Sequence, residues 1–94
     1  MTTDFDAARL HFLDGTAHLE AGRPDAAEAA LLASLQRLPG RPSTLLNLAV
    51  AQLALGKAAA ALGHLDAVLA QEPGDLQALT YRGTALQALA RQDE

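Results

Sequence analysis

The chain has 94 residues, half of them apolar, with three aromatic residues, no cysteine and a formal net charge of −4. This length allows one small domain, residues 1–94, and an acidic balance without a basic cluster argues against binding to nucleic acid or to an anionic membrane. The lack of cysteine excludes disulfides, thiolate metal sites and a cysteine nucleophile.

Turn residues divide the chain into five segments of helix-forming composition. In chain order, helices are predicted near residues 5–21, 24–38, 42–55, 57–71 and 76–90. Gly22 and Gly56 suit the left-handed residue that follows a helix end. Pro24 suits the first turn of a helix, and Asp75 suits an N-cap. Since no segment alternates with the period of two that a strand requires, we predict an all-α fold.

The turn signals recur at a fixed interval along the chain. The interval from Gly22 to Gly56 equals the interval from Pro39 to Pro73. A period of roughly 34 residues in a helical chain indicates stacked helical hairpins.

The residues at this period resemble the tetratricopeptide repeat. That pattern has a large residue at position 4, Leu at 7, a small residue at 8, an aromatic residue at 11, Ala at 20, a large apolar residue at 24 and Pro at 32. The matching residues are His11, Asp14, Gly15, His18, Ala27, Leu31 and Pro39 in residues 8–41, and Leu45, Leu48, Ala49, Gln52, Ala61, Leu65 and Pro73 in residues 42–75. A third repeat, residues 76–94, supplies Leu79, Arg82, Gly83 and Leu86. The departures from the pattern are the polar residues His11, Asp14, His18, Gln52 and Arg82.

The resemblance implies a right-handed α-solenoid of antiparallel helix pairs, with two full repeats and one additional helix. Stacking is expected to bury Leu31, Leu35, Leu45, Leu48, Leu65, Leu69 and Leu79 between neighbours. Small residues at Gly15, Ala27, Ala49, Ala61 and Gly83 are expected to let paired helices approach closely.

The third repeat stops where its second helix would begin, so we expect the chain to be a fragment of a longer protein. The competing interpretation is a natural end, with the last helix as a solvating cap. If the second helix is missing, Leu79 and Leu86 lack a cover. We then expect a homodimer formed through the C-terminal helix.

The sequence also bears on a metal site and on a catalytic site. His11, Asp14 and His18 share one helix face at a spacing that a metal could use, but no fourth ligand is evident. We expect no metal and no cofactor. No nucleophile-base pair or Gly-rich phosphate loop is present, so we expect no enzymatic activity from this segment.

The resemblance implies a peptide-binding groove lined by the first helix of each repeat. In this chain the predicted groove residues are Phe12, Thr16, Leu19, Leu46, Asn47, Val50, Leu53, Thr80, Thr84 and Gln87. Apolar residues on an open surface suggest a partner, but Phe12 and Leu46 could instead pack against each other. One class of the family binds the C-terminal carboxylate of a peptide through a specific set of residues. This chain matches that set only at Asn47, so we do not expect it to bind a terminal carboxylate in this way.

The predicted function is a scaffold or adaptor that binds a peptide or helix of another protein. The alternative is the N-terminal accessory segment of a larger bacterial enzyme, such as a methyltransferase or glycosyltransferase, and a third possibility is self-association. No segment approaches the roughly 18 apolar residues of a membrane span, and the start lacks an export signal. We therefore expect a cytoplasmic protein.

Overall fold

A computed structural model describes residues 3–92, and these form five α-helices without a strand. The all-α prediction is confirmed, and the helices begin and end within two residues of the predicted positions. They are α1 (Asp4–Glu20), α2 (Pro24–Arg37), α3 (Pro42–Ala54), α4 (Ala58–Gln71) and α5 (Leu76–Gln92).

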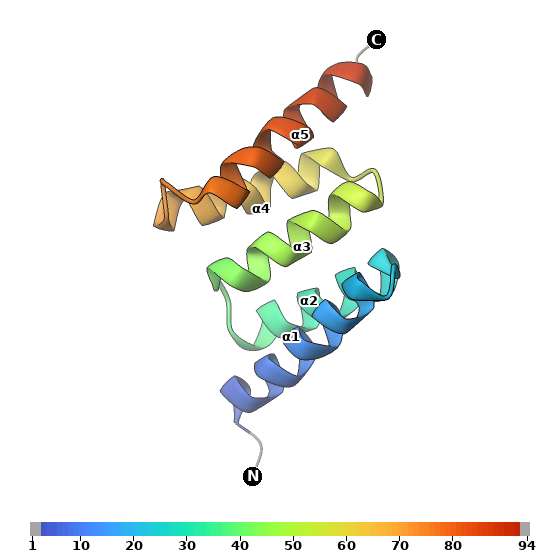
Figure 1. The fold of residues 1–94 in the computed structure, drawn as a ribbon. Coiled ribbons are helices and arrows are strands. Elements are labelled where there is room, and N and C mark those ends of the chain that lie inside the picture. Colours follow the sequence, from blue (N-terminus) through green and yellow to red (C-terminus); the bar gives the residue numbers. More distant parts are fainter. Residues whose placement is uncertain (1–2, 93–94) are drawn as a thin grey trace.

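The five helices form two layers. Each helix packs against the next one in the chain, and α3 also contacts both α1 and α5. Figure 1 shows α1, α3 and α5 on one side, α2 and α4 behind them, and consecutive helices running in opposite directions. The described part of the chain is elongated, with extents of 51 × 28 × 18 Å. The first helices of the three predicted repeats therefore share one face, which we call the odd-helix face.

The helix ends follow the local signals in the sequence. Gly22 and Gly56 have φ values of 74° and 77°, which a residue without a Cβ adopts at no steric cost. After each glycine, the next backbone N–H group bonds back into the preceding helix: Arg23 N donates to His18 O at 2.9 Å, and Lys57 N donates to Gln52 O at 2.8 Å. These bonds satisfy carbonyl groups that a helix end leaves free, so the two turns close in the same way.

The core consists of two clusters of buried apolar side chains. One lies among α1, α2 and α3 around Leu31 and Leu48, and the other among α3, α4 and α5 around Leu65 and Val68. Among the leucines predicted to be buried, Leu31, Leu45, Leu48 and Leu65 are buried, and Leu35 and Leu69 are half-buried. The prediction for Leu79 is wrong: it is 46% exposed, because no described helix covers that side of α5.

Two glycines at the same repeat position have different surroundings. A Cβ added to Gly15 would lie 2.6 Å from Leu31 Cγ, so this glycine does allow α1 and α2 to approach closely. A Cβ added to Gly83 would meet nothing within 4 Å among the described residues. The prediction of a close approach is therefore wrong at Gly83.

Gln52 stands where the family prefers an aromatic residue, and it is 4% exposed. Its Nε2 donates to Glu28 Oε2 at 3.3 Å, and its Oε1 lies 2.8 Å from His64 Nδ1. These bonds link α2, α3 and α4, and they satisfy the polar atoms that burial would otherwise leave unpaired. Arg82, another departure, donates from Nε to Asp66 Oδ1 of α4 at 2.8 Å.

Candidate functional site

All ten residues predicted to line the groove belong to α1, α3 and α5, the helices that share the odd-helix face. Seven are half-buried, on α1 and α3, and three are exposed, on α5. The half-buried ones are Phe12, Thr16, Leu19, Leu46, Asn47, Val50 and Leu53, and the exposed ones are Thr80, Thr84 and Gln87. The face is therefore apolar toward the N-terminus and neutral polar on α5.

The large apolar residues of this face also support the core. Phe12 and Leu19 pack against the cluster around Leu31, whereas Leu46 and Leu53 pack against the cluster around Leu65. Phe12 and Leu46 thus belong to different clusters. Each side chain contributes part of its surface to the core and leaves part of it accessible on the face.

A pocket of about 250 Å³ opens between α1 and the start of α3. It is lined by Phe5, Arg9, Phe12, Leu13, Arg41, Ser43 and Thr44. The guanidinium carbon of Arg41 lies 5.5 Å from the centre of the Phe5 ring, within the range of a cation–π contact. We call this hollow the α1/α3 pocket.

A second pocket of about 230 Å³ lies at the start of α5, lined by Leu76, Gln77, Thr80 and Tyr81. Gln77, Thr80 and Tyr81 follow Arg9, Phe12 and Leu13 by two repeat periods. Equivalent positions of the first and third repeats therefore line both pockets.

The ten predicted groove residues include only two of the residues that line these pockets, Phe12 and Thr80. The resemblance also assigns the second position of each repeat to the groove, and the residues there, Arg9, Ser43 and Gln77, line the pockets too.

The ten predicted groove residues omit Phe5 and Leu13, although both are exposed apolar residues on α1. The repeat period could have indicated Leu13, because it occupies the same repeat position as Asn47, which was included. Phe5 precedes the first repeat, and Arg41 is the N-cap of α3. The repeat pattern therefore assigns neither residue to the groove, and only the tertiary fold brings them together.

Two of the three residues considered as metal ligands, Asp14 and His18, make local contacts. His18 Nε2 lies 3.4 Å from Asp14 Oδ1, and Arg23 Nε donates to His18 Nδ1 at 3.2 Å. Within residues 3–92, no group of three or more His, Asp or Glu side chains is placed to hold a metal ion. Nor does any described helix have the length and apolar character needed to cross a membrane.

Glu28 is the carboxylate whose pKa the fold shifts most clearly. Lys57 Nζ lies 2.7 Å from its Oε1, and this hydrogen bond lowers the pKa of Glu28 below its ordinary value. Partial desolvation opposes the shift, while the hydrogen bond from Gln52 and the charges of Lys57 and His64 add to it. The group lies in α2, in the layer behind the odd-helix face, and it joins the two repeats.

Comparison with known proteins identifies a family and a relative. Residues 18–89 match the family model described as tetratricopeptide repeat. The human protein named "FK506-binding protein-like" is 41% identical over 90 residues, an alignment that covers 87% of this chain and 26% of that protein. This chain thus spans about a quarter of the length of that relative. Tetratricopeptide repeats generally mediate protein–protein interactions. Because the family model covers more than half of the sequence, the chain belongs to the tetratricopeptide repeat family.

Proposed function

We propose that the chain is a protein-interaction module, a scaffold or adaptor that binds a peptide or helix of another protein on its odd-helix face. The observation that carries the proposal is the half-buried apolar surface of α1 and α3, together with one pocket lined by residues of α1 and α3 and another lined by residues of α5. Such surfaces suit an extended peptide or an amphipathic helix, because both present side chains at regular intervals.

The proposal includes a right-handed solenoid, with full repeats at residues 8–41 and 42–75 and a partial repeat at 76–94. The matching geometry of the two closing turns at Gly22 and Gly56 supports this register. It also includes a cytoplasmic location, a role without catalysis, and no binding of nucleic acid or membranes. The net charge of −4 supports the last of these.

The test uses peptides selected from a random display library on the immobilised chain. Val50→Glu places a charge on the face at a residue that belongs to neither core cluster, and Ala60→Glu places the same charge on the exposed surface of α4. We expect Val50→Glu to weaken binding of the selected peptides at least tenfold and Ala60→Glu to leave it unchanged, with both variants retaining their helical circular dichroism. If both variants bind normally, the odd-helix face is not the binding surface.

A second candidate function is self-association through the outer side of α5. Leu79 and Leu86 are 46% and 42% exposed there, and Gly83 between them has open space around it. Arg82, on the same side, is neutralised by Asp66 and so does not oppose an apolar contact. The occupant we propose is the same side of α5 in a second copy, because a two-fold contact brings a patch against itself.

A further inference from the structure

The α1/α3 pocket combines an apolar wall with a positively charged rim. Phe5, Phe12 and Leu13 form the wall, and Arg9 and Arg41 carry the charge. No acidic residue lines the pocket, although the chain as a whole carries a net charge of −4. The four ion pairs found within residues 3–92 involve neither arginine. Both guanidinium groups therefore retain their capacity to pair with an anion.

The start of α3 adds further hydrogen-bond donors to the same pocket. Arg41 is the N-cap of α3 and provides no side-chain cap. The first bond of this helix runs from Leu45 N to Arg41 O, and the N–H groups of Ser43 and Thr44 form none of the hydrogen bonds found among the described residues. A helix N-terminus with free N–H groups favours a negatively charged partner.

Thr44 supplies a second and independent observation. It lines the pocket and is only 2% exposed, yet its hydroxyl forms none of the hydrogen bonds found within residues 3–92. The threonines at positions 80 and 84 of α5 both donate to a carbonyl one helical turn back. Among the described residues, no fully enclosed side-chain nitrogen or oxygen lacks a hydrogen bond, so the Thr44 hydroxyl keeps access to the pocket and can bond to a ligand there.

The start of α5 shows that a carboxylate can cap a helix at this position of the repeat. Asp75 occupies the same repeat position as Arg41, one repeat period later. Its carboxylate caps α5, because Asp75 Oδ1 accepts a hydrogen bond from Ala78 N at 2.8 Å. In α3 the chain provides a positive charge at this position instead of a carboxylate, so the complementary carboxylate would come from another molecule.

We propose that the α1/α3 pocket binds an acidic peptide segment of a partner protein. An Asp or Glu side chain of the peptide accepts hydrogen bonds at the start of α3 and pairs with Arg9 and Arg41, while a neighbouring apolar side chain packs on Phe5, Phe12 and Leu13. A volume of about 250 Å³ lies below the range of roughly 300–1,000 Å³ that is typical of small-molecule sites, and it suits single side chains. This inference rests on the proposed function, because it names the chemistry of the partner on the same face.

The test is a selection from a peptide pool that has a fixed Leu, randomised neighbours, and acetylated and amidated ends. Blocked ends remove terminal charges, and a parallel pool with free C-terminal carboxylates shows whether a chain end is recognised instead. We expect the full chain to enrich Asp and Glu beside the fixed Leu in the blocked pool. Enrichment only in the pool with free ends would overturn the proposal that a side-chain carboxylate is bound.

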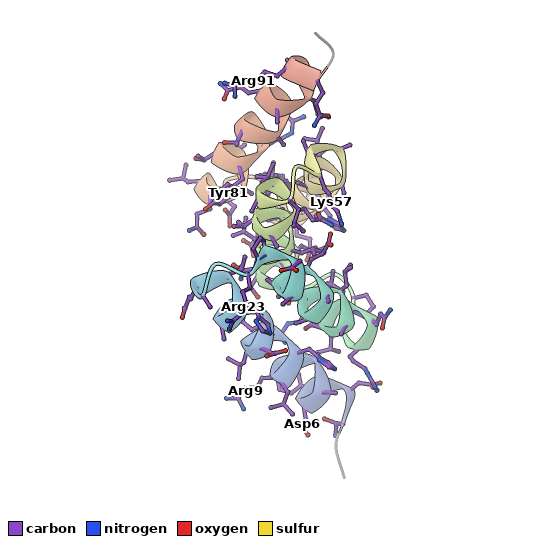
Figure 2. All side chains as sticks on the ribbon, turned by 90° about the vertical axis from the view of Figure 1, so that its right-hand side faces the viewer. Asp6, Arg9, Arg23, Lys57, Tyr81 and Arg91 are labelled. Atoms are coloured by element: carbon purple, nitrogen blue, oxygen red, sulfur yellow. The ribbon has the colours of Figure 1, made fainter. Side chains whose placement is uncertain are left out.

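Charge-reversal variants then locate the contact. Arg9→Glu and Arg41→Glu are each expected to weaken a selected peptide about tenfold, as the loss of a charged hydrogen bond does, and to shift the selection toward Lys and Arg. Arg91→Glu is the matched control, because Arg91 is an exposed arginine near the opposite end of the molecule (Figure 2). If the control variant weakens binding as much as the two pocket variants do, the effect comes from net charge and the site is wrong.

Thr44→Val tests the hydroxyl without changing the shape of the side chain. We expect it to weaken the selected peptide about threefold to tenfold while the melting temperature does not fall, since no hydrogen bond within the described chain is lost. A lower melting temperature with unchanged affinity would show that the hydroxyl serves the fold. If peptides bind and are sensitive to Val50→Glu but show no acidic preference, the partner chemistry is wrong and the proposed function stands. If no peptide is retained from either pool, both proposals fail.

Discussion

At the scale of single residues, the surroundings of a side chain decide what a substitution does, even where two repeats have the same residue. Gly15 and Gly83 share one repeat position, but only Gly15 has a helix packed against it. The Leu31 side chain that lies there is fully buried and has little room to move. This pair of glycines therefore offers a controlled measurement of helix packing.

Gly15→Ala is expected to destabilise the fold by up to about 2 kcal/mol. Overpacking costs typically about 1–3 kcal/mol, and the higher helix propensity of Ala offsets about 1 kcal/mol of it. Gly83→Ala is expected to raise the free energy of unfolding by about 0.5–1 kcal/mol, because at this position only the higher helix propensity of Ala acts. Urea unfolding followed by circular dichroism measures both variants. Equal effects at the two positions would contradict the packing of α1 on α2.

Glu28 predicts a pH dependence of stability. Its pKa is lower in the folded state than its ordinary value, so the unfolded chain binds the proton more readily as the pH falls. The associated stability is fully present above the ordinary carboxyl pKa, and it is lost as the pH falls from that value through the folded one. Denaturation at a series of pH values should show a smaller loss of stability in Glu28→Gln than in the parent chain. An identical acid profile in the two proteins would contradict the role of the contact with Lys57.

At the scale of helices, local sequence signals determine where each helix begins and ends, whereas tertiary contacts determine which side chains from distant segments meet. The five helices could be predicted closely because Gly22, Gly56, Pro24 and Asp75 act on the backbone nearest to them. The φ values of the two glycines and the cap at Asp75 confirm these predictions. Signals of this kind depend on a few neighbouring residues and not on the rest of the fold.

The candidate site was predicted less completely, because its geometry depends on contacts between distant segments. All ten predicted residues belong to α1, α3 and α5, which share one face, and their role in binding stays a prediction. The α1/α3 pocket escaped prediction, since Arg41 approaches Phe5 only through the packing of α1 and α3. The bond network of Gln52 likewise joins three helices, and no local pattern in the sequence indicates it.

The caps of α3 and α5 lead to a prediction at this scale. Asp75→Ala removes the bond to Ala78 N and is expected to cost about 0.5–2 kcal/mol. Arg41→Asp introduces the equivalent cap in α3 and is expected to raise stability by up to about 1 kcal/mol while it weakens binding of an acidic peptide at least about tenfold. Thermal unfolding and a peptide titration measure the two effects. A variant of Arg41 that is more stable and still binds the peptide would show that the carboxylate does not enter the pocket.

At the scale of the whole molecule, the two proposed contacts with other polypeptides use different surfaces of the described residues: the odd-helix face and the outer side of α5. They lie on different sides of α5, so each can be changed without the other. Thr84 is exposed and belongs to the predicted groove, whereas Leu86 is exposed on the outer side. Substitutions at these two positions can therefore separate self-association from peptide binding.

Self-association through α5 predicts a dimer whose population rises with protein concentration. Leu86→Lys should weaken the dimer, because it places a charge in the apolar contact, whereas Thr84→Lys adds the same charge on the other face and should leave the dimer unchanged. Sedimentation velocity over a range of concentrations measures the distribution. A parent chain that remains monomeric at high concentration would contradict the proposed contact.

The central claim is that the odd-helix face binds a polypeptide, and an NMR titration of the labelled chain with a selected peptide tests it most directly. Amide shifts are predicted to change most on α1 and α3 around Phe12 and Val50, to extend to the start of α5 around Thr80, and to stay small on the exposed surface of α4 around Ala60. Changes confined to α2 and α4, with the odd-helix face unaffected, would contradict the account.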